Sequence, residues 1–150
     1  MDSSPPLITD AGASPGFLLW RVTQRWQRGI AAALRPLDLT HAQFVLLMST
    51  AWLARDGVLP SQREVAGNAE ADPMMTSQVL RALERRGLVT RAADDADARV
   101  KRLAVTPAGK RLVKRAQAAV EAADRAFFAD AGDPDALLAQ LRELAAWPSR

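Results

Sequence analysis

The stretch from Ser61 to Thr106 constrains the fold more than any other part of this 150-residue chain. It opens with Ser61-Gln62-Arg63-Glu64, a capping-box pattern in which Ser and Glu side chains bond the free N–H groups at a helix start. Asp72-Pro73 supplies a second N-cap, with proline at the first helical position. Gly87 stands where glycine commonly ends a helix. The pattern predicts two short helices separated by a turn at Glu70-Ala71.

Two segments with alternating apolar and polar residues follow, Leu88–Arg91 and Arg102–Val105. They predict two strands joined by the polar turn Ala92–Lys101. Helix, helix, strand, turn and strand in this order is the layout of a winged helix-turn-helix, whose second helix fits the major groove of DNA. The fold class predicted is therefore mainly α with a small β-wing (α+β).

Helices are predicted on both sides of this unit. Residues 17–35 carry apolar side chains at three- and four-residue steps before Pro36, and this apolar stripe is wide enough to pack on two sides. Thr40-His41-Ala42-Gln43 is another capping box, and Thr106-Pro107 and Asp133-Pro134 repeat the cap-plus-proline start. These three signals predict helices that end near residues 54, 131 and 146. The expected buried face of the first of them is Phe44, Leu47, Met48, Ala51 and Trp52.

Basic residues concentrate in the middle of the chain. The whole sequence has a net charge of +3. Residues 72–115 contain 11 Lys/Arg and five Asp/Glu, which gives this segment a charge of +6 and leaves −3 for the rest. The asymmetry favours a face that binds a polyanion, and a solvated basic surface explains the charge equally well.

The composition excludes several classes of protein. Hydrophobic residues make up 49% of the chain, enough for one modest core, yet no apolar run approaches the ~20 residues of a membrane span. Residues 1–16 are polar and rich in Pro, Ser and Gly, which predicts a disordered tail and not a signal peptide. The absence of cysteine excludes disulfides, thiolate zinc sites and thiol-based sensing. A cytoplasmic protein without cofactor or metal is the simplest interpretation.

The predicted second helix of the helix-turn-helix carries polar residues in its first turns. These are Thr76, Ser77 and Gln78, followed one turn later by Arg81. Gln can pair with adenine and Arg with guanine through two hydrogen bonds, and each such pair discriminates between bases by about 1–3 kcal/mol. The alternative is a polar helix face with no partner. The surrounding layout favours contact with a DNA groove.

The turn between the strands contains Asp94, Asp95 and Asp97 before Arg99. A calcium loop is disfavoured because the glycine and the distal glutamate of such a loop are missing. A second interpretation is that an aspartate orients the Arg99 guanidinium for insertion into a DNA minor groove, where the negative potential is strongest. A solvated hairpin is the third.

From Leu39 to Gly109 the chain resembles the MarR (multiple antibiotic resistance regulator) family of bacterial transcription regulators. An ordered set of residues carries the resemblance, and no single motif in it is unique. The set is Leu39–Phe44, Gln78–Arg91, Asp94, Asp97, Arg99, Lys101, Arg102 and Leu103–Gly109.

This resemblance implies one domain over residues 17–150, assembled as a homodimer. Residues 17–37 and 107–150 would be the dimerisation helices, and residues 40–106 the winged helix-turn-helix. The helix after Asp72 would be the recognition helix, with Arg99 at the wing tip held by an acid such as Asp97. Met74 and Met75 depart from the small polar residues common in the family, so the base preference near them stays open. DNA contacts are expected from Ser61, Gln62, Thr76, Ser77, Gln78, Arg81, Asp97, Arg99 and Lys101.

The family also implies a small aromatic or anionic effector that binds between the dimerisation helices and the winged part. Trp20, Arg21 and Arg25 on the first helix and Trp52 on the second could supply stacking and charge for it. The favoured alternative is that both Trp residues are core and both Arg residues are solvated.

Catalysis finds little support in the sequence. His41 is the only histidine, it lies in a capping box, and the chain has no Cys or Tyr to act with it. Neither a phosphate-binding glycine loop nor an H-E-x-x-H zinc helix is present. The function predicted is that of a sequence-specific homodimeric DNA-binding regulator, a repressor that reads a pseudo-palindrome and is released by a ligand. A non-specific architectural DNA-binding protein and a protein-interaction module are the alternatives.

Overall fold

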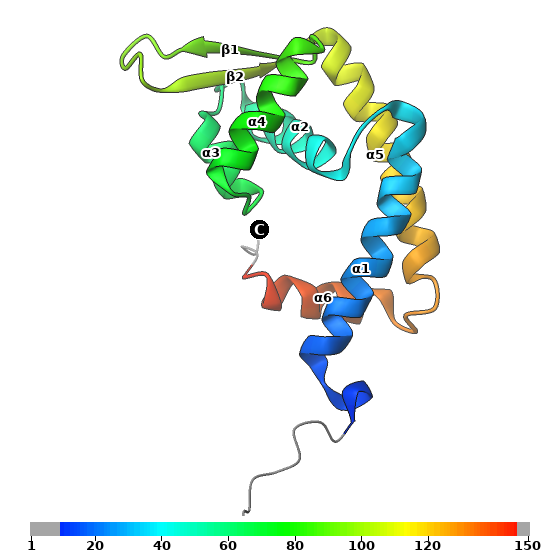
Figure 1. Ribbon diagram of the computed structural model, residues 1–150. Coiled ribbons are helices and arrows are strands. Elements are labelled where there is room, and N and C mark those ends of the chain that lie inside the picture. The colour runs from blue at the N-terminus through cyan, green and yellow to red at the C-terminus, as the bar shows by residue number, and fades with distance from the viewer. Residues whose placement is uncertain (1–9, 147–150) are drawn as a thin grey trace, which may run out of the picture.

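The computed structural model describes residues 10–146. Residues 40–106 form a winged unit, and three helices beside it form a helical base (Figure 1). The winged unit contains α2 (His41–Leu53), α3 (Gln62–Asn68), α4 (Pro73–Arg85) and the antiparallel strands β1 (Val89–Ala93) and β2 (Lys101–Val105). The helical base contains α1 (Pro15–Leu34), α5 (Pro107–Phe128) and α6 (Pro134–Leu144). Short 3-10 turns occupy Ala11–Ala13, Arg35–Leu37 and Ala54–Asp56.

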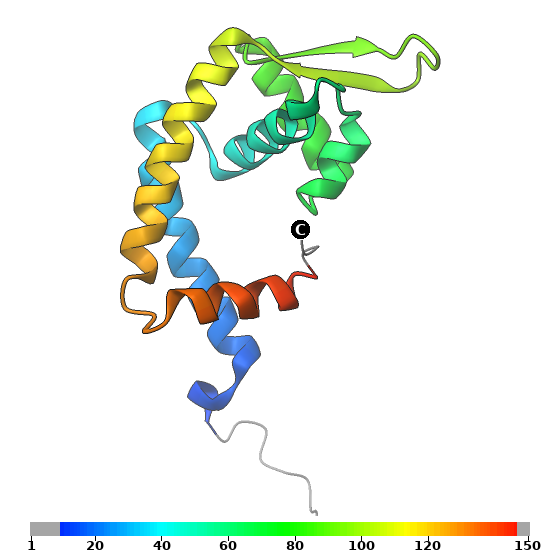
Figure 2. The ribbon, with the colours of Figure 1, turned by 180° about the vertical axis from the view of Figure 1, so that it is seen from behind.

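The two parts have different shapes. The two views in Figures 1 and 2 show α1 and α5 side by side, with α6 crossing at the end far from the wing. The wing projects from the opposite end of the molecule. Within residues 10–146, no helix is long and apolar enough to cross a membrane.

All five predicted helix starts are confirmed. Both capping boxes form reciprocal bonds: the Gln43 N–H donates to Thr40 Oγ1 at 3.1 Å, and the Glu64 N–H donates to Ser61 Oγ at 3.1 Å. Asp72, Thr106 and Asp133 each accept backbone N–H groups ahead of a proline. These bonds fix where each helix begins because they satisfy donors that have no partner inside the helix.

The disordered tail predicted for residues 1–16 is wrong over its described part. Asp10 accepts the Gly12 N–H at 2.8 Å and caps a 3-10 turn. Ser14 then caps α1, with Pro15 at its first position, which is the same signal that predicted α4. Residues 1–9 lie outside the described part. Three other boundaries differ from the prediction: α5 ends at Phe128, β1 runs on to Ala93 and β2 begins at Lys101.

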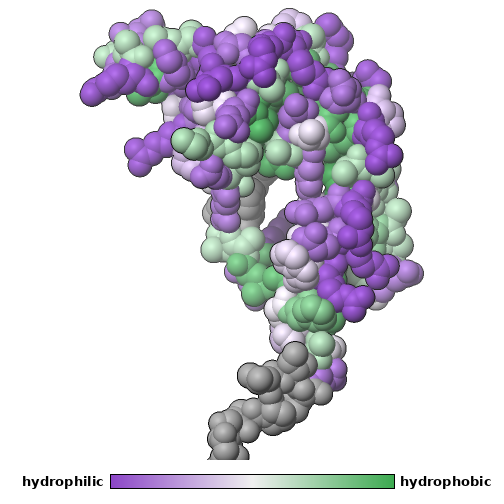
Figure 3. Space-filling model, in the orientation of Figure 1, coloured by the Kyte–Doolittle hydropathy of each residue, from purple (hydrophilic) through white to green (hydrophobic). Residues whose placement is uncertain are grey.

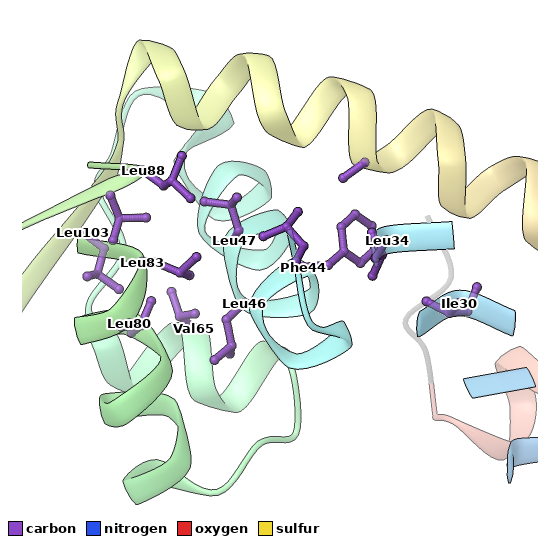
Figure 4. Close-up of a cluster of buried hydrophobic side chains, with 13 residues drawn as sticks. Ile30, Leu34, Phe44, Leu46, Leu47, Val65, Leu80, Leu83, Leu88 and Leu103 are labelled. Atoms are coloured by element: carbon purple, nitrogen blue, oxygen red, sulfur yellow. The ribbon is translucent and has the colours of Figure 1, made fainter. Parts of the chain in front are cut away.

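The core lies between α2, α3, α4 and the strands. Figure 4 shows Leu46, Leu47, Leu80 and Leu83 pointing toward one another, and all four are fully buried. Because α2 contacts α1, α3, α4, α5 and β2, its buried positions run around most of the helix. Single-face periodicity therefore placed Trp52 in the core wrongly. Trp52 is exposed at the end of α2, with the Arg55 guanidinium 4.0 Å from its ring centroid.

The helical base joins the winged unit through close packing at the start of α5. Gly109 is buried there, and a Cβ at this position would clash with the Leu88 carbonyl oxygen and lie 2.7 Å from Val105 Cγ1. Further along, Trp26 of α1 donates from Nε1 to Asp124 of α5 at 2.7 Å. The base therefore sets the orientation of the winged unit through backbone contact at α5 and through α1.

Candidate nucleic-acid interface

One face of α4 points away from the core along its whole length. Gln78 and Arg81 are exposed on it and Ser77 is half-buried, whereas Leu80 and Leu83 are buried on the opposite face. The predicted DNA-contacting role of Thr76 is wrong, since its side chain is 0% exposed. Thr76 lies four and seven residues before Leu80 and Leu83, which places all three on the same helix face. Its Oγ1 has no hydrogen-bond partner within the described residues.

A tight turn sets the position of α4. The Ala71 N–H donates to the Ala66 carbonyl at 2.9 Å, and Glu70 adopts a left-handed φ of 47°. Asp72 then caps α4 by accepting the Met75 N–H at 2.8 Å. At the other end Gly87 has a φ of 69°, and the N–H groups of residues 87 and 88 bond back to α4 carbonyls, as in a Schellman motif. Both ends of the candidate recognition helix are therefore fixed.

The acidic residues of the wing order its loop. Asp94 accepts the N–H groups of Ala96 and Asp97 through Oδ1, and its Oδ2 accepts Arg102 Nε at 2.6 Å. Arg102 is the main reason that the pKa of Asp94 is lowered. Asp97 binds the Arg99 guanidinium through both oxygens, at 3.1 and 3.2 Å, and this pair lowers the pKa of Asp97. The Arg99 side chain nevertheless stays 91% exposed, so it is oriented and accessible at once.

Two arginines fasten the wing to the helices. Arg102 of β2 contacts Glu64, the capping-box acid of α3, at 3.4 Å. Arg91 of β1 forms an ion pair with Glu84 of α4 at 2.9 Å and donates to Gln62 of α3 at 3.3 Å. Each arginine joins a strand to a helix that is distant in sequence, so the wing is held at a fixed angle to α3 and α4.

These contacts leave a groove of about 740 Å³ between the wing and α3. It brings together four predicted DNA contacts, Ser61, Gln62, Arg99 and Lys101. The sequence prediction missed Arg63, because an exposed arginine in a short helix carries no local signal. The residues that line the groove are Ser61, Gln62, Arg63, Ala66, Gly67, Glu70, Ala71, Pro73, Arg99, Val100 and Lys101.

Charge at the groove favours a polyanion. Within residues 10–146, Arg63, Arg81 and Lys101 form no ion pair and are exposed. Asp94, Asp97 and Glu64 nearby all bind cations or helix N–H groups, whereas Glu70, the carboxylate that lines the groove itself, is exposed. The free cations can therefore neutralise phosphates, and the engaged acids repel them less than their number suggests.

The four predicted ligand contacts are not brought together at the junction between the winged unit and the base. Trp20, Arg21 and Arg25 are exposed on the outer half of α1, and the idea that both Trp side chains are core is wrong. Two other clefts open at that junction. One, of about 510 Å³, is lined by Gln27, Ala31, His41, Ala42, Val45, Leu46, Ala69, Glu70, Ala71 and Met75. The other, of about 440 Å³, shares Ala31 and His41 and is lined also by Arg35, Asp38, Leu39, Thr40, Gln43 and Arg86.

Known proteins match the chain over most of its length. A winged-helix domain described as ArnR1-like matches residues 36–121. The HTH-type transcriptional regulator YdcH of Bacillus subtilis is 42% identical over 131 residues, 87% of this chain and 89% of that protein. The HTH-type transcriptional repressor Rv2887 of Mycobacterium tuberculosis is 39% identical over 76% of this chain and 79% of its own length.

Solved structures also match the chain over most of its length. CouR from Rhodococcus jostii, whose structure is bound to p-coumaroyl-CoA, superposes with a TM-score of 0.80 at 32% identity, covering 95% of this chain and 99% of CouR. The MarR family protein Rv2887, in complex with p-aminosalicylic acid, gives a TM-score of 0.70 at 33% identity over 89% and 99% of the two chains. The predictions of a winged helix-turn-helix, of a DNA-binding regulator and of a non-enzyme are confirmed. The chain belongs to the MarR family of winged helix-turn-helix transcription regulators.

Proposed function

We propose that this chain is a cytoplasmic homodimeric repressor that reads a pseudo-palindromic DNA site and leaves it when a small aromatic or anionic effector binds. One observation carries the DNA half of the proposal. The exposed Gln78 and Arg81 of α4 and the held, exposed Arg99 of the wing belong to one rigid unit with a basic groove between α3 and the wing.

Each polar side chain has a distinct role in this proposal. Gln78 and Arg81 lie where a recognition helix meets base edges, so they read adenine and guanine. Arg99 enters the adjacent minor groove while Asp97 fixes its guanidinium plane. Ser61, Gln62, Arg63, Ser77 and Lys101 bind backbone phosphates, which sets the register of the helix on the duplex.

The helical base provides the surface that contacts a second copy of the chain. The exposed large apolar residues of the base include Phe17, Leu18, Leu19 and Trp20 on α1 and Leu138, Leu141 and Leu144 on α6, and Figure 3 shows apolar surface over α6 and the lower part of α1. Exposed apolar surface on this scale commonly marks a site of interaction with another protein. Two-fold pairing through this area would place two recognition helices on half-sites one helical turn apart, ~34–36 Å.

The DNA proposal is tested by selecting genomic fragments with purified protein and measuring affinity for the best fragment and for a scrambled version. We expect the selected site to bind at least ~10³-fold more tightly, with an affinity that falls steeply as salt rises. Arg99→Ala should weaken binding about tenfold, whereas Arg28→Ala, an exposed arginine of the base, should not. Equal affinity for both duplexes would instead favour a non-specific architectural protein.

The effector half rests on the junction cleft that touches the α3–α4 turn. A ligand there would contact Ala69, Glu70 and Ala71, the turn that sets the position of α4, and Met75 within α4 itself. The neighbouring cleft adds the cations Arg35 and Arg86 for an anionic group. CouR and Rv2887 are each seen with an aromatic ligand that carries an acidic group, which supports this chemistry.

Ala31 offers a specific test, because it lines both clefts. Ala31→Phe should fill them and leave operator binding intact while abolishing release by p-coumaroyl-CoA or p-aminosalicylate. Ala32→Phe is the matched control, since Ala32 is exposed and lines neither cleft. Release of DNA from the Ala31→Phe protein at the wild-type effector concentration would place the effector elsewhere.

A further inference from the structure

Met74 is an apolar side chain in an unexpected place. It is 75% exposed in the first turn of α4, directly after the capping Asp72 and Pro73. Among residues 10–146, the large apolar side chains that the winged unit leaves exposed are Trp52, Val58, Leu59 and Met74. Of these, Met74 alone belongs to the candidate recognition helix. Met74 takes no part in the hydrophobic core, whereas its neighbour Met75 packs against that core.

The spacing along α4 puts Met74 on the DNA-facing stripe. At 100° per residue, positions 74, 78, 81 and 85 fall within about 60° of one another. Gln78, Arg81 and Arg85 are all exposed, which confirms that this stripe faces away from the core. The N-terminal residues of a recognition helix are the ones that contact base edges. Met74 therefore stands in the turn that a recognition helix presents to base edges.

The chemistry of the major groove limits what an apolar side chain can recognise there. Adenine, guanine and cytosine present donors and acceptors, whereas thymine adds a 5-methyl group. A methionine side chain is unbranched and polarisable, so it adapts to a small apolar partner. We infer that Met74 reads thymine through its 5-methyl group, one helical turn before Gln78 reads adenine.

This inference rests on the proposed DNA-binding function and names a base that its site must contain. Replacing thymine by deoxyuridine removes the methyl group and leaves base pairing unchanged. We expect one such replacement, made symmetrically in both half-sites, to weaken wild-type binding. The loss should be about fourfold per half-site, which corresponds to about 0.8 kcal/mol for one buried methyl group. Replacements at other thymines should have much smaller effects.

The same scan on Met74→Ala identifies the side chain responsible. This variant should bind the thymine and deoxyuridine duplexes with equal affinity, whereas Met74→Leu should keep most of the difference. Val58→Ala is the matched control, because Val58 is exposed to a similar extent (72%) in the winged unit but lies outside α4. It should keep the full difference. Circular dichroism and thermal unfolding of each variant show whether it is folded.

The outcomes separate this inference from the function on which it rests. If wild-type protein binds selected and scrambled duplexes equally, the proposed function fails. If it prefers the selected duplex but tolerates deoxyuridine at every position, Met74 does not read thymine. A thymine preference that survives in Met74→Ala would overturn the inference in the same way, because another residue would then contact the methyl group.

Discussion

The winged unit and the helical base differ in how far their large apolar side chains are buried. In the winged unit, Leu46, Leu47, Leu80, Leu83 and Leu103 close on one another with almost no exposure (Figure 4). In the base, α1 and α6 leave a series of large apolar residues in water, and Trp20 reaches 63% exposure. The core therefore lies mainly in the winged unit, whereas the base leaves apolar side chains exposed that a second copy would cover in the proposed dimer.

Polar contacts follow the same division. Ion pairs of the winged unit, such as Arg91–Glu84 and Arg102–Glu64, tie its strands to its helices. The contact of the Trp26 indole with Asp124 ties α1 to α5. For α6, within the described residues, no side-chain hydrogen bond or ion pair to another element is found. The base therefore relies on apolar area, which is the kind of surface that assembles permanent dimers.

The largest expected effect comes from charging the base. Leu138 lines an apolar groove between α5 and α6 together with Phe128, Leu137 and Leu141. Leu138→Glu should raise the dissociation constant of the proposed dimer at least a thousandfold, because a two-fold interface buries the unpaired carboxylate twice. Sedimentation velocity measures the shift. Val58→Glu, on an exposed apolar residue of the winged unit, should leave the dimer intact, and a dimeric Leu138→Glu protein would contradict the assignment of this face.

The join between the two regions should be the next most sensitive point. Gly109→Ala places a Cβ against the Leu88 carbonyl oxygen, and backbone cannot move aside as a flexible side chain can. We expect a loss of about 3 kcal/mol in the free energy of unfolding, measured by denaturant titration. Gly29→Ala is the control, since a Cβ there meets nothing within 4 Å. That variant should gain up to about 1 kcal/mol from helix propensity. Equal stabilities would mean that the base is not locked onto the winged unit at Gly109.

Within the winged unit, a substitution at Thr76 tests whether this residue is structural or contacts DNA. Thr76→Val replaces a buried hydroxyl without a hydrogen-bond partner by a methyl group of similar size. The free energy of unfolding should rise by about 1 kcal/mol, with operator affinity unchanged. Fluorescence anisotropy with labelled operator measures the affinity. A loss of affinity comparable to that of Gln78→Ala would restore Thr76 to the DNA-contacting surface.

Local signals predicted most of the fold, because helix starts are decided by a few adjacent residues. The caps at Thr40, Ser61 and Asp72 needed no knowledge of distant contacts. The error at Thr76 came from assuming that every polar residue in the first turns faces DNA. The phase set by Leu80 and Leu83 placed Thr76 inside, and this information was already in the sequence.

Long-range features could not be predicted in the same way. The groove with Arg63 exists because Arg102 and Arg91 hold the wing beside α3, across separations of 38 and 29 residues respectively. The junction clefts are lined by residues of α1, α2 and the α3–α4 turn that come together only in the folded chain, and no single stretch of sequence marks them as a pocket. Trp20 has the same pattern whether it meets its own core or another subunit, so sequence periodicity cannot distinguish the two.

The smallest effect should come from pH at the contact between the two regions. His41 of α2 packs edge-on against Trp26 of α1, with ring centroids 5.1 Å apart. Burial lowers the pKa of His41, and the nearby Asp124 of α5 partly opposes this. The adjoining clefts add Glu70, Asp38, Arg35 and Arg86 as charged neighbours. The pKa of His41 is therefore lower in the folded chain than in the unfolded chain. At a pH between these two values, the unfolded chain binds more protons than the folded chain.

Stability should accordingly fall as pH drops below about 6.5, the ordinary pKa of histidine, because the folded state resists the proton. The carboxyl groups of Glu64, Asp94 and Asp97 have lowered pKa values, so the stability they contribute is lost only at lower pH, below about 4. Denaturant titrations between pH 7.5 and 5.5 isolate His41. The His41→Phe protein keeps an aromatic ring against Trp26 and should lose less stability on acidification than wild type. Equal losses in the two proteins would show that this contact between base and winged unit does not sense protons, and that its stability comes from packing alone.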